Sequence, residues 1–233
     1  MDKPAGVTSA RVVDRIKRLL PSGVKVGHAG TLDAFATGLL VLLVGRATRL
    51  CEDVMRRPKT YEATIKFGAT TTTDDPESPE TLVPVPQPPA HDAVASALRS
   101  FVGRIEQTPP RYSALKVGGR RASDRARDGQ EIDLRPRVVH IYSAELTSFD
   151  WPLARVRVEC GRGTYIRAVA RDLGAALGVG GYLVALRRTR IGDIDVTQAI
   201  DPATADADAV ARALIPAAPP GASSGVDRPP PRG

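Results

Sequence analysis

The sequence is short of cysteine, histidine and aromatic residues, and these shortages restrict what the chain can do. Its 233 residues include two cysteines, three histidines and only 4% Phe, Trp and Tyr. Cys51 and Cys160 stand alone, with no CxxC pair and no histidine at metal-ligand spacing. This spacing favours buried thiols in a reducing compartment over a disulfide framework or a metal site. With so few rings, the core must consist mainly of Val, Leu, Ile and Ala.

Long apolar runs and nucleotide-binding motifs are also missing. The longest uninterrupted apolar run covers residues 39–44, which is far too short for a membrane span. The first residues have no signal-peptide pattern. No P-loop, no GxGxxG between strand and helix, no GxSxG, no HExxH and no internal repeat occurs. We therefore expect a cytoplasmic protein that needs no nucleotide cofactor and no metal.

The charge balance is basic, with a formal net charge of +7. Basic side chains interleave with Tyr112 between residues 104 and 137, where Gly118 and Gly119 predict a flexible joint. Between residues 155 and 190, eight arginines stand against one glutamate and one aspartate. This imbalance indicates a polyanionic partner such as RNA or DNA. An ordinary solvated surface is the alternative interpretation of the first stretch.

The most distinctive stretch is the loop Gly-His-Ala-Gly-Thr-Leu-Asp-Ala-Phe-Ala-Thr-Gly at residues 27–38. Its glycines allow the backbone to approach a ligand closely and to adopt positive φ. An aspartate held among small residues is a candidate nucleophile or base, which here is Asp33. In the alternative interpretation the glycines serve only turns and Asp33 is a capping residue. The residues of the loop alone leave both interpretations open.

Apolar periodicity divides the chain into predicted helices and strands. Apolar positions three and four apart predict helices, whereas alternation and short continuous apolar runs predict strands. The predicted helices cover residues 9–20, 47–57, 93–102, 166–177 and 203–214. The predicted strands cover residues 39–44, as a buried central strand, and residues 61–67, 138–149, 153–160 and 180–186. Residues 68–89 are expected to form a long loop, and residues 216–233 a disordered tail.

Seven blocks of sequence, in order, resemble the bacterial tRNA pseudouridine-55 synthases of the TruB type. The loop at residues 27–33, followed by residues 36–40, resembles the catalytic motif of that family. The other blocks are residues 2–9 (the opening motif), Tyr61 (the active-site tyrosine), the Thr-x-Thr-x-Asp pattern of Thr71, Thr73 and Asp75, residues 109–116 (the start of an RNA-clamping insertion), residues 160–167 (the third motif) and residues 186–188 (the last motif).

The resemblance implies an α+β pseudouridine synthase fold, with a central mixed and largely antiparallel sheet flanked by helices. Residues 104–137 would form a basic RNA-clamping insertion over the RNA cleft of a catalytic domain at residues 1–200. Residues 201–233 would be a largely disordered Ala/Pro-rich tail, with no full C-terminal RNA-binding domain. The implied activity is isomerisation of uridine to pseudouridine in the T-arm of tRNA, at uridine 55 of the T loop, by base flipping. The resemblance implies a monomer that needs no cofactor and does not bind a membrane.

The resemblance also assigns roles to individual residues. Asp33 would be the essential group, acting at C1′ or at C6 of the uridine, with Arg167 paired to its carboxylate. Tyr61 would stack on the flipped base and assist proton transfer at C5. The implied substrate-binding residues are Lys3, His28, Gly30, Thr31, Tyr165 and Leu186, with Lys3 on a phosphate. The implied contacts to the RNA backbone are Arg111, Lys116, Arg120, Arg121, Arg162, Arg187 and Arg188.

Two positions depart from the family pattern. Ala34 stands where the family usually has a proline, which would fix φ and stiffen the loop after Asp33. Ser123 stands where an aromatic residue is common in the insertion. These departures are the only support for an alternative, a non-catalytic RNA-binding or tRNA-folding module on the same scaffold. A DNA-binding domain is a third interpretation, but no recognisable groove-reading helix supports it.

Overall fold

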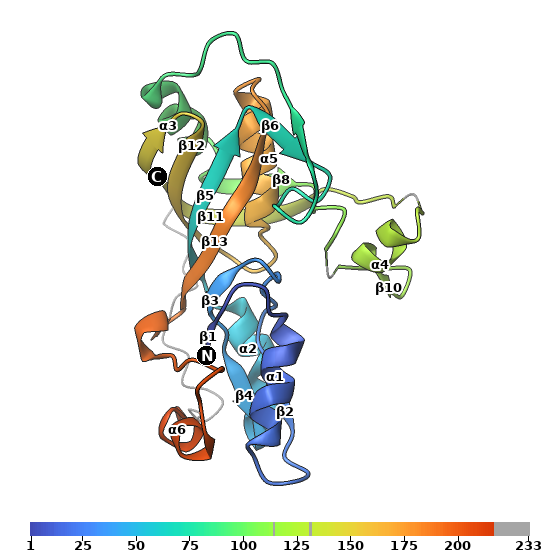
Figure 1. Cartoon of the computed structure of the whole chain (residues 1–233), viewed down its shortest axis with the longest axis vertical. Helices are drawn as coiled ribbons and strands as arrows, with labels where there is room; N and C mark the ends of the chain where they lie inside the picture. Colours follow the sequence, from blue (N-terminus) through green and yellow to red (C-terminus); the bar gives the residue numbers. More distant parts are fainter. Residues whose placement is uncertain (114, 131, 217–233) are drawn as a thin grey trace, which may run out of the picture.

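The computed structural model describes residues 1–113, 115–130 and 132–216. Its frame is an eight-stranded sheet in the order β1-β3-β13-β5-β12-β11-β8, with β14 paired to β13 (Figure 1). Only the pairing of β3 with β13 is parallel within this described sheet, so the predicted mixed and largely antiparallel sheet is confirmed. The strands are β1 (Asp2–Lys3), β3 (Thr37–Leu39), β5 (Lys59–Phe67), β8 (Gly103–Gln107), β11 (Arg137–Asp150), β12 (Leu153–Cys160), β13 (Gly181–Ile191) and β14 (Ile194–Asp195).

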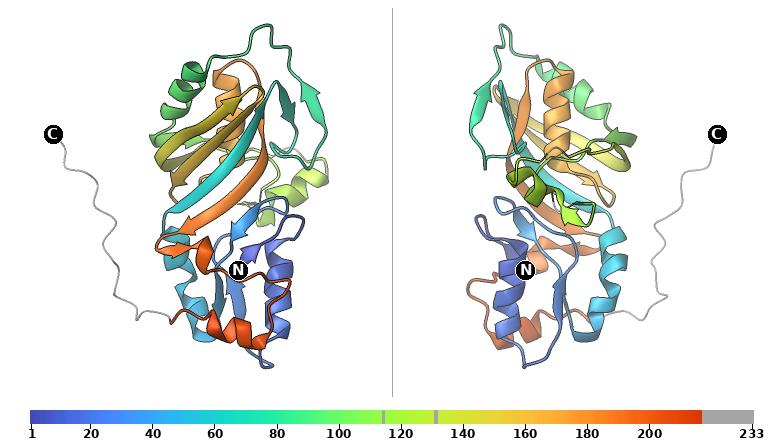
Figure 2. Two further views of the ribbon diagram at one scale, coloured as in Figure 1. Left: turned by 60° about the vertical axis from the view of Figure 1, so that its left-hand side comes forward. Right: turned by 90° about the vertical axis from the view of Figure 1, so that its right-hand side faces the viewer.

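One face of this sheet carries two helices, α3 (His91–Arg99) and α5 (Ile166–Ala176), and the other face is open (Figure 2). The alternation in β5 explains the arrangement, because Tyr61, Ala63, Ile65 and Phe67 are buried under the helices while Glu62 is exposed. The structure confirms the predicted strands at residues 61–67, 138–149, 153–160 and 180–186, and the predicted helices at residues 93–102 and 166–177.

Charges alternate across the open face of the sheet. In the strand register, Glu145 lies opposite Arg157, Arg157 opposite Glu62, and Glu62 opposite Arg187. Arg157 pairs with Glu62 at 3.3 Å, and Arg187 pairs with Asp2 at 2.7 Å. Cross-strand pairs of opposite charge stabilise a sheet modestly. They also place an acidic side chain beside Arg157 and beside Arg187 on this face.

A smaller lobe surrounds the end of the sheet that β1 and β3 form (Figure 1). Two small apolar clusters hold it together with the last described helix, and its short ladder pairs β2 with β4. The predicted helix at residues 47–57 is a 3₁₀ turn followed by one α-helical segment. The elements are α1 (Ser9–Arg18), β2 (Val26–His28), β4 (Leu42–Val44), η1 (Gly45–Leu50), α2 (Cys51–Arg56), η2 (Val196–Gln198) and α6 (Ala207–Arg212).

The prediction of one central strand at residues 39–44 is wrong. Leu39 ends β3 in the large sheet, and Leu42 begins β4 in the ladder with β2. Between them the backbone changes partners, because the Leu40 amide donates to the carbonyl of Met1 and the Val41 carbonyl accepts from the amide of Ala29. The run is apolar because both sheets bury it, and not because it forms one strand.

The segment between β8 and β11 leaves the sheet and projects from the body (Figure 1). Arg104 to Gln107 belong to β8 and pair with β11, so the insertion itself begins at Thr108, four residues later than expected. It carries β9 (Lys116–Val117), β10 (Arg120–Arg121) and α4 (Ala122–Arg127). We refer to residues 108–136 as the insertion.

Two further predictions concern residues 68–89 and residues 216–233. The expected loop at residues 68–89 holds a small hairpin of β6 (Ala69–Thr71) and β7 (Glu80–Leu82). The prediction of a disordered tail falls on residues 216–233, of which 217–233 lie outside the described residues. Within the described ranges, no helix is long and apolar enough to cross a membrane.

Candidate active site

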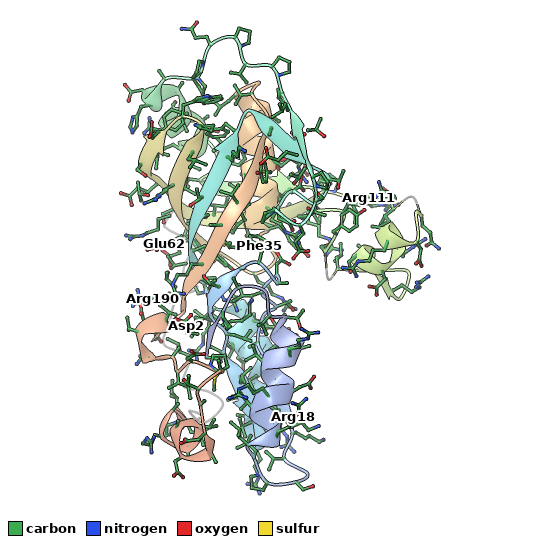
Figure 3. The ribbon with its side chains drawn as sticks, in the orientation of Figure 1. Asp2, Arg18, Phe35, Glu62, Arg111 and Arg190 are labelled. Carbon is green, nitrogen blue, oxygen red and sulfur yellow. The ribbon has the colours of Figure 1, made fainter. Side chains whose placement is uncertain are left out.

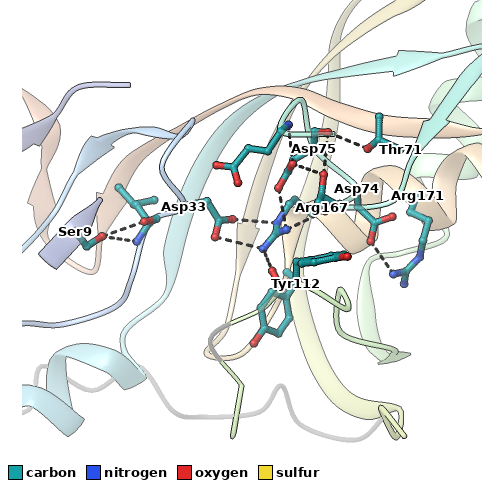
Figure 4. Close-up of polar contacts among 12 residues, drawn as sticks. Ser9, Asp33, Thr71, Asp74, Asp75, Tyr112, Arg167 and Arg171 are labelled. Carbon is teal, nitrogen blue, oxygen red and sulfur yellow. Dashed lines mark hydrogen bonds and ion pairs between the residues drawn. The ribbon is translucent and has the colours of Figure 1, made fainter. Parts of the chain in front are cut away.

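Arg167, in the first turn of α5, reaches across to the loop at residues 27–38 and pairs with Asp33 (Figure 4). Its Nε lies 3.0 Å from Oδ2 of Asp33, and its Nη2 donates to Oδ1 over 3.2 Å. The Arg167 side chain is 4% exposed, whereas that of Asp33 is 37% exposed. The structure therefore brings these two residues together as expected, and it leaves part of the Asp33 carboxylate open to a ligand.

A second carboxylate holds Arg167 from the other side. Nη1 of Arg167 donates over 2.9 Å to Oδ2 of Asp75 and over 2.9 Å to the carbonyl of Thr73. Asp75 is buried, and its Oδ1 accepts from the Thr73 hydroxyl and from the amide of Glu77. The Thr-x-Thr-x-Asp pattern drew attention to this segment, but Asp75 was not among the expected site residues. Sequence alone gave no sign that it faces Arg167.

The electrostatics of the site suit a reactive carboxylate. Burial raises the pKa of Asp33, Arg167 opposes that rise, and Asp75 adds to it. Because two carboxylates share one guanidinium, the group keeps a net negative charge, and Asp33 is its more exposed member. A carboxylate fixed by a charge-assisted pair, with an accessible oxygen, can act as a nucleophile or as a base.

The expectation that Lys3 holds a phosphate is wrong, because Lys3 is completely buried. Its Nζ donates to the carbonyls of Pro4, Val7 and Ala34, over 2.8, 2.6 and 3.1 Å. Burial lowers the pKa of Lys3 to about 8, with the Asp33 carboxylate acting in the opposite direction. The amide of Gly6 also donates to Ala34, over 2.8 Å. The opening segment of the chain therefore fixes the residue after Asp33.

The residue before Asp33 is fixed in a similar way by Ser9. The Ser9 hydroxyl donates to the carbonyl of Leu32 over 3.0 Å and accepts from the amide of Leu32 over 2.9 Å. Thr8 caps α1 by accepting from the amide of Arg11, and so sets where Ser9 points. Asp33 thus sits between two anchored neighbours, although Ala34 replaces the usual proline.

Arg188 is also buried, so the expectation that it contacts the RNA backbone is wrong. It is 1% exposed, and it donates to the carbonyl of Leu39 over 2.8 Å and to that of Gly30 over 2.9 Å. Gly38 packs so tightly against the Arg188 backbone that an added Cβ would lie 2.3 Å from the Arg188 oxygen. Gly38 also has φ of +99°, so only glycine fits at this position. Arg188 therefore joins the two ends of the loop.

Tyr61 and Leu186 form an apolar wall beside Asp33. They come from the neighbouring strands β5 and β13, and they pack with Leu32 and Ala36 of the loop in one cluster. Tyr61 is 9% exposed, and burial raises the pKa of its hydroxyl while Arg188 opposes the rise. Their place beside the loop fits the expected roles at the base, which stay predictions.

The remaining expected site residues lie around this centre. His28 and Gly30 are half-buried on the loop, Thr31 is exposed, and Tyr165 is half-buried directly before α5. Three predicted backbone contacts are exposed: Arg111 leaves the body with the insertion (Figure 3), Arg120 pairs with Asp128, and Arg162 pairs with Glu52. The side chains of Lys116 and Arg121 lie outside the described part of the structure.

Arg187 is half-buried, and its contact with the RNA backbone stays a prediction. It lies on the open face of the sheet, where both of its terminal nitrogens donate to Asp2. In Figure 3 this face, with Glu62 and Asp2, lies on the opposite side of the molecule from Arg111. In the part of the chain that the structure describes, no group of three or more His, Cys, Asp or Glu is placed to hold a metal ion.

Comparisons with known proteins point to one family. Residues 17–166 match the sequence model of the TruB family pseudouridylate synthase (N terminal domain). The chain is 44% identical over 207 residues to tRNA pseudouridine synthase B of Bacteroides fragilis, covering 87% of this chain and 89% of that protein. It is 50% identical over 208 residues to tRNA pseudouridine synthase B of Thermobifida fusca, covering 85% of this chain and 70% of that protein.

A solved structure is similar as well. A chain in the crystal structure of a Cbf5-Nop10-Gar1 complex superposes with a TM-score of 0.62 at 29% identity. The match covers 83% of this chain and 49% of that chain, so this chain spans about half the length of that solved relative.

Proposed function

The chain belongs to the TruB family of pseudouridylate synthases, and we propose that it converts uridine 55 in the T loop of tRNA to pseudouridine with Asp33 as nucleophile. The relatives that are 44% and 50% identical carry the name tRNA pseudouridine synthase B, which supports tRNA as the substrate. The observation that carries the catalytic part of the proposal is the Asp33 carboxylate, partly exposed and held by Arg167.

The reaction is an isomerisation, so atoms and electrons balance without a further reactant. The bond between N1 of the uracil and C1′ of the ribose breaks, the base turns, and a bond between C5 and C1′ forms. The proton on C5 is lost and N1 gains one. Asp33 attacks either C1′ or C6, and in both cases it must be ionised. Arg167 favours the ionised form against the effect of burial.

The base must leave the folded T loop to reach Asp33, which costs on the order of a few kcal/mol. The apolar wall of Tyr61 and Leu186 is where we place the flipped uracil, with the Tyr61 ring against its face. A wall of this kind also retains the detached base while it turns. His28 and Thr31, on the more exposed part of the loop, then face the nucleotides around the flipped one.

The RNA backbone is best placed on the side of the insertion. Arg111 and Arg120 are exposed there, whereas the open face of the sheet carries balanced charges. Ala34 does not support the alternative of a non-catalytic RNA-binding module, because Lys3 and Gly6 both donate hydrogen bonds to the carbonyl of that residue.

The test is release of tritium from a T-arm hairpin that carries 5-³H-uridine at position 55. We expect the wild-type chain to release one equivalent of tritium and to leave pseudouridine at that position. The control is a hairpin with cytidine at position 55 and labelled uridines elsewhere, which should release none. No release from the first hairpin, or equal release from both, would contradict the proposal.

A further inference from the structure

We propose that Gln107 is a positioning residue, which clamps the start of α5 and thereby sets the placement of Arg167 against Asp33. The proposal rests on the proposed function. It concerns a residue that touches neither the substrate nor the reacting carboxylate.

The side-chain amide of Gln107 makes two hydrogen bonds to the backbone of one residue, Tyr165. Gln107 is the last residue of β8 and is 2% exposed. Its Oε1 accepts from the amide of Tyr165 over 2.8 Å, and its Nε2 donates to the carbonyl of Tyr165 over 3.2 Å. A planar amide that is bonded through both ends fixes the orientation of the Tyr165 backbone as well as its position.

Tyr165 is the capping position of α5, and no side chain caps the helix there. Its backbone is extended, and its carbonyl also accepts the first helical hydrogen bond, from Val169. Without a capping side chain, the Gln107 amide is the described contact that orients this end of the helix. Arg167 follows two residues later, so a tilt at Tyr165 moves its guanidinium.

The chain that follows Gln107 continues the same contact. The carbonyl of Thr108 accepts from Nη2 of Arg171 over 2.8 Å, and that of Tyr112 accepts from Nη2 of Arg167 over 2.9 Å. Residues 107–112 are therefore joined to α5 at three successive points. This segment is also the root from which the insertion leaves the body (Figure 1). The placement of Arg167 therefore depends on the placement of the insertion. Gln107 is the residue of this segment that holds the Tyr165 backbone.

A hollow of about 620 Å³ lies between this root and the body, with Thr108, Arg111 and Arg171 among its lining residues. RNA bound to the insertion would pull on the Tyr112–Arg167 contact, and the Gln107 clamp would hold the start of α5 in place. This arrangement predicts that loss of the clamp affects the chemical step more than RNA binding.

The experiment measures single-turnover pseudouridine formation and RNA affinity with the full chain and the T-arm hairpin. For Gln107→Ala we expect the rate constant to fall on the order of tenfold to a hundredfold, as small misplacements of catalytic groups do. The dissociation constant should stay within about threefold, because no phosphate contact is lost. The matched control is Asp206→Ala, which removes the capping bond to Ala209 in α6, in the other lobe, and should change neither value.

Gln107→Glu separates positioning from a loss of folding stability. An ionised Glu at this position can accept from the Tyr165 amide, but it cannot donate to the carbonyl. Burial raises the pKa of such a carboxyl group, so acid protonates it and restores the donor. We expect the ratio of the Gln107→Glu rate to the wild-type rate to rise as the pH falls from about 8 to about 5.5. The ratio for Gln107→Ala should stay flat.

Hydrogen exchange at the Tyr165 amide supplies a readout that does not depend on activity. The amide should exchange faster in Gln107→Ala than in the wild type, and the amides of α6 should not change. A wild-type rate for Gln107→Ala, or a Gln107→Glu ratio that does not vary with pH, would overturn the proposal. If Gln107→Ala does not fold, the Gln107→Glu profile decides. Failure of the wild-type chain to form pseudouridine would instead remove the proposed function.

Discussion

The Lys3 ammonium group donates a hydrogen bond to the Ala34 carbonyl over 3.1 Å, one residue after Asp33. This contact holds the backbone of residue 34 from outside, whereas a proline there would fix φ. It also places a residue that looked like a phosphate ligand inside the protein. The loop that carries Asp33 is therefore organised by the first nine residues of the chain.

Lys3→Met should weaken both the fold and the reaction. The substitution keeps an unbranched side chain but removes a charged donor from three carbonyls. Hydrogen bonds to charged groups contribute about 1.5–3 kcal/mol each, so we expect a loss of at least about 2 kcal/mol in the free energy of unfolding. Urea denaturation gives this value, and single-turnover assays should show a slower rate with unchanged RNA affinity. Reduced RNA affinity with an unchanged free energy of unfolding would instead indicate that Lys3 contacts a phosphate of the RNA.

Asp75→Asn should lower the rate and shift its pH dependence. The second carboxylate raises the pKa of Asp33, so its removal should lower that pKa. The acidic limb of the rate profile should then move to lower pH. The plateau rate should fall on the order of tenfold to a hundredfold, because one of the two anchors of Arg167 is weakened.

The measurement for Asp75 is the single-turnover rate as a function of pH, with the exposed Asp150→Asn as the matched control. Asp150→Asn should follow the wild-type profile. An acidic limb that moves upward in Asp75→Asn, or that stays in place, would contradict the role of Asp75 next to Asp33.

Arg188→Met should affect stability and not the salt dependence of RNA binding. Each phosphate contact adds about 0.9 to the slope of log affinity against log salt. Arg188 is buried on the carbonyls of Leu39 and Gly30, so its removal should leave that slope unchanged and lower the melting temperature. Arg120→Met, on the exposed insertion, should lower the slope and leave the melting temperature unchanged. If the two variants change the salt slope and the melting temperature in the same way, burial does not determine which of these arginines contacts the RNA.

Much of the fold follows from local sequence pattern. The strand at β5 could be predicted because Tyr61 to Phe67 alternate, and one face of that strand is covered while the other is open. The apolar run at residues 39–44 could not be interpreted in this way. Its division depends on the partners of Leu40 and Val41, Met1 and Ala29, and no local pattern encodes pairing at such distances along the chain.

The site shows the same limit. Three arginines that look alike in sequence have different surroundings in the structure. Arg167 pairs with Asp33, Arg187 pairs with Asp2, and Arg188 is buried and donates to the Leu39 carbonyl. Charge and residue type are local properties, but burial depends on the tertiary fold. Asp75 was missed as a site residue for that reason, because only the fold brings it to Arg167.

The catalytic role of Asp33 is tested most directly by Asp33→Asn in the tritium-release assay with the T-arm hairpin. The substitution keeps the size of the side chain and removes its charge, while Lys3 and Ser9 still hold the neighbouring residues. We expect wild-type RNA affinity and no tritium release above the background without enzyme. Release at the wild-type rate would contradict the catalytic role of Asp33, because the isomerisation would then proceed without the Asp33 carboxylate.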